Sequence, residues 1–297
     1  MISQGAGSAR RSEWALCVFF LYIAVLSVWR NHGVSFPATV ACIIPLGLLT
    51  VARGDSRSTR NSWSIVRDWI PVVLLVVAYW SIDWVPAASP NRELERTLVA
   101  WDRTLLSDWG VREATEHFGL LLPTVLELAY LVLYAVVPLS IASFYFYDER
   151  EQLDNFLFPF LLGTLTAYAL LPHFPVEGPR FAFSGEDLPH VESVFRRMNL
   201  WILNHWDIRS SVFPSGHVAA AFSTAFAMRL AAPGRRALFG ALLAIALLVW
   251  MNTVYGRYHY AADGLASLAV SVSTISLLLA YDSFTERTQC PTADRRP

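Results

Sequence analysis

The sequence predicts an all-α integral membrane protein, a helical bundle of about six to eight transmembrane helices. Of its 297 residues, 55% are hydrophobic and 16% are charged, whereas soluble domains average about 25% charged residues. The mean hydropathy is positive, at +0.41. Apolar runs close to the length that crosses a bilayer as a helix recur along the chain, with polar loops between them.

Eight apolar runs are candidate spans. The first follows Arg10 and Arg11 in the manner of a signal peptide, but it continues to Trp29 without a clear small-residue cleavage site, which favours a retained span. The fourth is the longest, as expected of a helix that is tilted or extends past the bilayer. The runs lie near residues 14–30, 34–52, 69–88, 119–146, 155–172, 215–232, 237–254 and 264–282.

Two long polar loops interrupt this pattern. The second, residues 173–212, is rich in charged residues and histidines. The first, residues 89–117, is predicted to contain an amphipathic helix, because apolar residues recur in it at spacings of three and four. Two placements of this helix stay open: flat in the membrane interface with its tryptophans as anchors, or packed on the protein itself. Its apolar positions are Leu94, Leu98, Trp101, Leu105 and Trp109.

Arginines predict the orientation of the chain. Residues 53–67 carry four arginines, and an excess of positive charge marks cytoplasmic loops. With eight spans, both termini and the turn 233–236 share this cytoplasmic side. The two long loops, the segment FPSGH (213–217) and the segment YGRYHYAAD (255–263) then meet on the extracytoplasmic side.

The spacing of His259 and Asp263 predicts a contact between their side chains. Residues four apart lie on one face of a helix, and the eighth run begins near here. A carboxylate on one imidazole nitrogen fixes the tautomer and leaves the other nitrogen free as a nucleophile. The alternative is a structural His–Asp pair at the start of a helix.

The segment FPSGH predicts an anion site at the start of the sixth run. Pro214 suits the first turn of a helix, and Gly216 allows backbone to approach a ligand closely. The free N–H groups of the helix start and the Ser215 hydroxyl attract an anion, beside which His217 can donate a proton to a leaving oxygen. The alternative is a serine cap followed by an interfacial histidine.

A third candidate element is PVEGPR (175–180), at the end of the fifth run. Arg180 offers a planar guanidinium that matches phosphate oxygens. Taken alone, such an arginine also fits a side chain that reaches the lipid headgroups. All three elements fall on one predicted side of the membrane, which favours a single phosphate-handling site.

Together these elements resemble the type 2 phosphatidic acid phosphatase superfamily, which also includes vanadium haloperoxidases. That pattern has a first motif ending in arginine and proline, a second ending in PSGH, and a third in which an aspartate follows a histidine by four residues. The resemblance covers roughly residues 91–281 and implies a six-helix phosphatase-type catalytic core. PVEGPR and HYAAD (259–263) are most similar to the style of the branch that contains inositol phosphorylceramide synthases.

The resemblance implies a mechanism without metal or cofactor. His259 attacks phosphorus to form a phosphohistidine, and Asp263 orients it. His217 protonates the leaving alcohol and then activates water or an acceptor hydroxyl. Donors around the phosphate stabilise the charge of the transition state. The residues implied in this binding role are Arg180, Ser215 and Gly216.

Three positions depart from the family pattern. His173 stands where a lysine is usual, Phe181 where a proline is usual, and Thr253 where the third-motif arginine is usual. Arg257, close to the third-motif histidine, is the candidate replacement for that arginine as a phosphate ligand. Arg209 is the alternative.

These features predict a membrane lipid phosphatase or phosphotransferase that acts on a lipid or lipid-linked phosphoester at the extracytoplasmic face of the cell membrane. An inositolphosphotransferase similar to inositol phosphorylceramide synthase is one alternative, and a non-catalytic transporter or scaffold derived from the same fold is another. A metal-dependent alcohol phosphotransferase is disfavoured because it needs clustered aspartates.

The sequence indicates no nucleic-acid partner and no particular oligomeric state. Three segments are predicted: N-terminal helices with the basic loop (1–88), the catalytic domain (89–282) and a polar tail (283–297).

Overall fold

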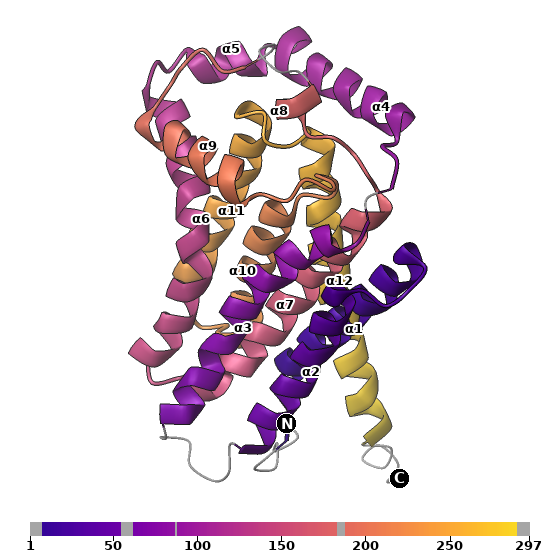
Figure 1. Ribbon diagram of the computed structural model, residues 1–297. Helices are drawn as coiled ribbons and strands as arrows, with labels where there is room; N and C mark the ends of the chain where they lie inside the picture. The colour runs from indigo at the N-terminus through magenta and orange to yellow at the C-terminus, as the bar shows by residue number, and fades with distance from the viewer. Residues whose placement is uncertain (1–7, 55–61, 87, 183–187, 290–297) are drawn as a thin grey trace, which may run out of the picture.

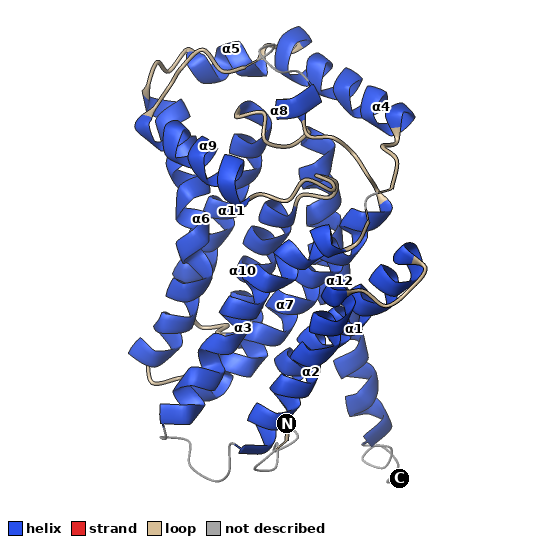
Figure 2. Ribbon diagram, viewed as in Figure 1, coloured by secondary structure: helices blue, strands red, loops and turns tan. Residues whose placement is uncertain are grey.

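The structure is a computed structural model, and it describes residues 8–54, 62–86, 88–182 and 188–289. Within these ranges the secondary structure is helical, without any strand (Figure 2), which confirms the predicted all-α class. In chain order the helices are α1 (Arg11–Asn31), α2 (Phe36–Gly54), α3 (Ser62–Ser81), η1 (Ile82–Trp84), α4 (Arg92–Arg103), η2 (Thr104–Asp108), α5 (Val111–Glu116), α6 (Leu121–Phe146), η3 (Arg150–Gln152), α7 (Leu153–Leu170), η4 (Leu171–His173), α8 (Pro179–Ala182), α9 (Val194–Trp206), α10 (Gly216–Ala231), α11 (Arg236–Tyr255) and α12 (Ala261–Gln289).

The predicted apolar runs are helices of one bundle. Seven of the described helices are long and apolar enough to cross a membrane. An eighth, α10, has 16 residues and is therefore about 24 Å long, shorter than the hydrocarbon core of about 30 Å. It packs against α7, α11 and α12 in the middle of the bundle (Figure 1).

The polar loops gather at one end of this bundle. Helix α1 begins and α12 ends at the opposite end, and α4, α5 and α8 lie across the end that carries the loops (Figure 1). This arrangement agrees with the eight-span prediction that FPSGH and YGRYHYAAD face the same side. Arg57 and Arg60 of the basic loop, together with residues 290–297 of the tail, lie outside the described residues.

Helix α3 begins earlier than predicted, at Ser62, because its first turns hold buried, paired charges. The Arg67 Nε atom lies 2.6 Å from Glu13 Oε1 in α1, and Asp68 Oδ2 lies 2.5 Å from Arg150 Nε beside α7. Charges are tolerated inside a protein when they are paired, so a search for apolar runs misses these turns. One ion pair therefore joins α3 to α1, and the other joins α3 to η3, the turn that leads into α7.

Helix α4 is the predicted amphipathic helix, and its two faces differ in exposure. Leu98 is buried, whereas Trp101 is 60% exposed. Helix α4 is therefore packed on the protein through one face, and Trp101 points away from it. Trp109, which follows η2, is also exposed, at 74%. Two acids, Glu95 and Asp102, also lie on the buried face, which the apolar pattern does not show.

Candidate active site

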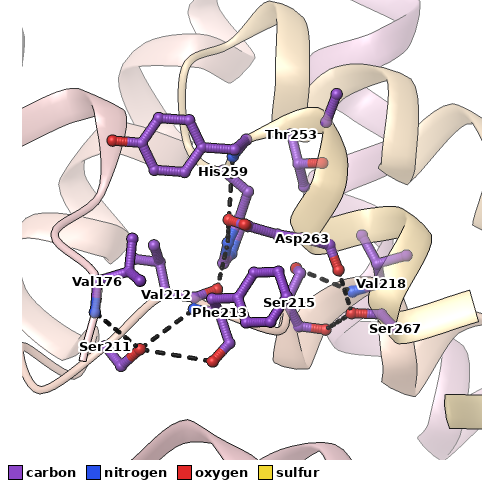
Figure 3. A network of polar contacts seen from close by, with 12 residues as sticks. Val176, Ser211, Val212, Phe213, Ser215, Val218, Thr253, His259, Asp263 and Ser267 are labelled. Carbon is purple, nitrogen blue, oxygen red and sulfur yellow. Dashed lines mark hydrogen bonds and ion pairs between the residues drawn. The ribbon is translucent and has the colours of Figure 1, made fainter. Parts of the chain in front are cut away.

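His259 lies in the turn between α11 and α12, and Asp263 lies in the first turn of α12. The His259 Nδ1 atom lies 3.2 Å from Asp263 Oδ2 and 3.0 Å from the carbonyl oxygen of Val212 (Figure 3). Because both neighbours are acceptors, the proton of the neutral imidazole belongs on Nδ1, which leaves Nε2 unprotonated. The predicted contact therefore forms, but through a turn rather than along one helix face.

Asp263 also joins the start of α12 to the start of α10. Its side chain is fully buried, and Oδ2 accepts the Tyr260 N–H at 3.0 Å. Its carbonyl oxygen accepts the Ser215 N–H at 3.3 Å. The Ser267 Oγ atom lies 2.7 Å from the Asp263 carbonyl oxygen and 2.8 Å from that of Ser215 (Figure 3). The second and third sequence motifs are thus joined directly by hydrogen bonds.

His217 lies in the first turn of α10, and its ring centroid is 6.1 Å from that of His259. Its Nδ1 is buried and has no hydrogen-bond partner among the described residues, while Nε2 lies 3.5 Å from the Tyr134 hydroxyl. The rings of Tyr130 and Tyr79 lie 5.2 Å and 5.9 Å away, between centroids. With no strong partner on either nitrogen, the ring can exchange a proton with a substrate oxygen.

Ser215 and Gly216 form the start of α10. The Ser215 hydroxyl oxygen accepts the Val218 N–H at 3.4 Å, so the serine does cap the helix. A Cβ at Gly216 would lie 2.7 Å from the ring of Tyr168, so the packed tyrosine is what excludes a larger residue here. The first N–H groups of a helix have no intrahelical partners, and they are the anion-binding groups that the sequence predicts.

Arg180 lies in the short helix α8 and pairs with an acid that sequence reasoning missed. Its Nη2 atom lies 3.0 Å from Asp207 Oδ2, and its Nη1 atom lies 3.3 Å from Asn204 Oδ1. Asp207 also accepts a hydrogen bond from the Tyr79 hydroxyl of α3. Asp207 and His217 line the same cavity, so the structure brings the first motif close to the second.

Arg257 is buried and has a left-handed backbone, with φ of 63°. Its Nη1 atom lies 2.6 Å from Asp102 Oδ2 of α4, and Asp102 Oδ1 accepts the Ala261 N–H at 2.8 Å. Burial raises the pKa of Asp102 to about 6, although the Ala261 amide and Arg257 act in the opposite direction. The ion pair with Arg257 and the hydrogen bond from Ala261 tie α4 to the turn that carries His259.

Asp102→Ala is expected to destabilise the protein by about 3–5 kcal/mol, because it removes one partner of a buried ion pair. The measurement is thermal unfolding of the detergent-solubilised protein at pH 8. Asp108→Ala is the matched control, since Asp108 is exposed in the adjoining η2 turn and such surface changes stay within about 0.5 kcal/mol. Equal melting temperatures for the two variants would contradict the role assigned to Asp102.

The three departures from the family pattern have different surroundings. Thr253 is buried, and its carbonyl oxygen accepts the N–H groups of Tyr258 and His259, each at 2.9 Å. His173 Nε2 lies 2.7 Å from the hydroxyl of Tyr22 in α1. Phe181 is exposed, and so is Arg209, the alternative replacement for the third-motif arginine.

A buried network beneath the turn that carries His259 centres on Glu127 of α6. Its Oε1 atom lies 3.0 Å from Arg196 Nη1, and its Oε2 atom lies 2.7 Å from Asn199 Nδ2, both of α9, and 2.9 Å from the Tyr258 hydroxyl. Burial and the Glu127 carboxylate raise the pKa of Tyr258 well above its usual value, so it donates as a neutral phenol. The sequence signal for this network is Glu127 itself, an acidic residue inside an otherwise apolar run.

Among the described residues, no group of three or more His, Cys, Asp or Glu is placed to hold a metal ion.

Comparison with known proteins identifies the family to which the chain belongs. No curated protein and no solved structure matches the chain. A family model described as the PAP2 superfamily matches residues 96–277, which contain all three motifs. With more than half of its length matched, the chain belongs to the PAP2 superfamily.

Proposed function

We propose that the protein is an integral-membrane enzyme that cleaves a phosphoester of a lipid or lipid-linked substrate through a phosphohistidine on His259. Membership of the PAP2 superfamily supports phosphatase-type activity. The observation that carries the proposal is the pair of acceptors on His259 Nδ1, Asp263 at 3.2 Å and the Val212 carbonyl at 3.0 Å. They leave Nε2 as an unprotonated nucleophile close to a second histidine.

In the first half-reaction, His259 Nε2 attacks phosphorus as the bond between phosphorus and the alcohol oxygen breaks. His217 gives its proton to that oxygen, so the alcohol leaves neutral. The positive charge that develops on His259 is balanced by the buried Asp263 carboxylate. In the second half-reaction, His217 takes a proton from water or an acceptor hydroxyl, whose oxygen attacks the phosphohistidine and releases the histidine.

The phosphate oxygens are assigned to the donors at the bundle end. Ser215 and the first N–H groups of α10 form one part of this cradle. Arg180 forms another once phosphate replaces Asp207 as its partner, since both offer the guanidinium two oxygens. Arg257 is also assigned to the phosphate oxygens, because it lies in the same turn as His259. In this role Asp102 orients its guanidinium.

The acceptor decides between two outcomes of the same chemistry. Water makes the enzyme a phosphatase, whereas an alcohol makes it a phosphotransferase. The style of PVEGPR and HYAAD favours an inositolphosphotransferase similar to inositol phosphorylceramide synthase as the second candidate.

The purified protein is incubated in EDTA with phosphatidic acid or diacylglycerol pyrophosphate. Release of phosphate supports the phosphatase, and a new phospholipid from an inositol lipid and a lipid alcohol supports the transferase.

The proposed extracytoplasmic orientation is tested by cysteine labelling of whole cells, with the native cysteines replaced by serine. Glu192 is exposed before α9, and Glu151 is exposed in the turn between α6 and α7, at the other end of the bundle (Figure 1). Glu192→Cys is expected to react with an impermeant maleimide in intact cells, and Glu151→Cys only after the membrane is opened. The reverse pattern would place the site on the cytoplasmic side.

A further inference from the structure

A cavity of about 300 Å³ lies between α3, α6, α9 and α10. Its walls are mainly aliphatic: α3 contributes Val72, Leu75 and Val76, and α6 contributes Leu133 and Val137. Val76 is 45% exposed, so the cavity reaches the apolar surface of the bundle at α3. Its volume is at the lower end of the range for small-molecule sites, which suits a single narrow apolar group.

The same cavity also has a polar part. His217, Asp207, Tyr79 and Tyr134 line it; the Tyr79 hydroxyl donates to Asp207, and the Tyr134 hydroxyl lies 3.5 Å from His217 Nε2. The cavity therefore runs from the apolar surface to the histidine that is assigned the proton transfer. A molecule that fills it has a hydrocarbon part along α3 and an oxygen at His217.

We propose that this cavity binds the hydrocarbon chain of the substrate's alcohol and places the ester oxygen of that alcohol at His217. The inference rests on the proposed function, because His217 protonates the leaving oxygen and so faces the alcohol rather than the other phosphate oxygens. The polar part of the cavity holds the Asp207 carboxylate, paired with Arg180, and the Tyr79 and Tyr134 hydroxyls, which suit the oxygen atoms of an ester rather than a hydrocarbon chain. The substrate class is thus a phosphoester of a long-chain alcohol.

Helix α3, which forms one wall of this cavity, lies outside the segment matched by the family model. The part of the site that would select the hydrocarbon chain of the substrate therefore includes residues beyond that segment. The family match begins at residue 96, whereas α3 ends at Ser81. Yet α3 provides one wall of the cavity and, through Tyr79, a hydrogen bond to Asp207. We assign α3 the role of closing the site on the side where the hydrocarbon chain binds.

The test compares Val76→Trp with Val73→Trp, two substitutions on one helix. Val76 lines the cavity, whereas Val73 does not and is 63% exposed. The substrates are dodecyl phosphate and the short, soluble p-nitrophenyl phosphate. Each buried methylene is worth up to about fourfold in kcat/KM, so Val76→Trp is expected to lower kcat/KM for dodecyl phosphate at least about tenfold. Turnover of p-nitrophenyl phosphate stays within about twofold, and Val73→Trp leaves both substrates unchanged.

A second variant guards against a local distortion at position 76. Val72→Trp, one turn earlier on the same cavity wall, is expected to show the same selective loss. The inference is overturned if the ratio of the two kcat/KM values is unchanged in both cavity variants, if both substrates are lost equally, or if Val73→Trp changes the ratio as much. If the unmodified protein shows no His259-dependent turnover of either substrate, the proposed function itself fails, which is a distinct result.

Discussion

Replacing His259 with alanine is expected to lower phosphoester turnover by at least about 10³-fold, since removal of a nucleophile eliminates the covalent path. The assay measures phosphate released from phosphatidic acid by the purified protein in EDTA. Incubation with a substrate labelled on phosphorus is also expected to leave acid-labile phosphate on the unmodified protein and none on the variant. Both effects have one cause, because Nε2 of His259 is the only atom assigned to attack phosphorus.

His117→Ala is the matched control for this experiment. His117 is exposed at the end of α5, and turnover should be unchanged when it is replaced. Turnover by His259→Ala equal to that of the unmodified protein would exclude the phosphohistidine path. Loss of activity in EDTA before any substitution would instead support a metal-dependent phosphotransferase.

Asp263→Asn is expected to lower kcat by about 10²–10³-fold with little change in KM. In a serine-protease triad, an Asp→Asn change of this kind costs about 10⁴-fold because the histidine adopts the wrong tautomer. Here the tautomer is protected in two ways. The Val212 carbonyl also accepts from His259 Nδ1, and the Tyr260 N–H requires an oxygen at the position of Oδ2. In Asp263→Asn the side-chain amide oxygen therefore faces His259, and the loss of kcat reflects the missing negative charge.

Asp263→Ala separates charge from geometry. It removes the hydrogen bonds to both His259 and Tyr260, so kcat is expected to fall below that of Asp263→Asn. In Asp263→Asn, the amide nitrogen would take the place of Oδ1, which is buried and has no partner among the described residues. Because a buried N–H group without an acceptor can destabilise the fold, a melting temperature is measured for each variant. Unchanged kcat in Asp263→Asn would show that the carboxylate is structural only.

The candidate site residues can be predicted from the sequence because their signals are local. His259 and Asp263 are four positions apart, and Ser215, Gly216 and His217 are consecutive. The spans were equally visible, because hydrophobicity along a run is a property of neighbouring residues. The early start of α3 was missed for the opposite reason. Its buried charges are tolerated only because Glu13 and Arg150, far away in the sequence, neutralise them.

The acidic partners of the two candidate phosphate-binding arginines could not be predicted from neighbouring residues. Their places in the motifs predict Arg180 and Arg257 as phosphate ligands. Their partners in the structure are Asp207 and Asp102, and Asp102 stands 155 positions before Arg257. An isolated acid in a polar loop carries no sign of its partner. Its position on the inner face of an amphipathic helix becomes informative only once that face is known to be buried.

The sequence by itself determined the helical membrane bundle and the presence of His217, His259 and Asp263 at one end of it. Hydrophobic length, span parity and short motif spacing are sufficient for these conclusions because each depends on neighbouring residues. Only the tertiary structure decided which acids hold the arginines and that α3 forms a wall of the cavity at His217. Those contacts join segments distant in sequence, and they depend on how side chains pack when the helices meet.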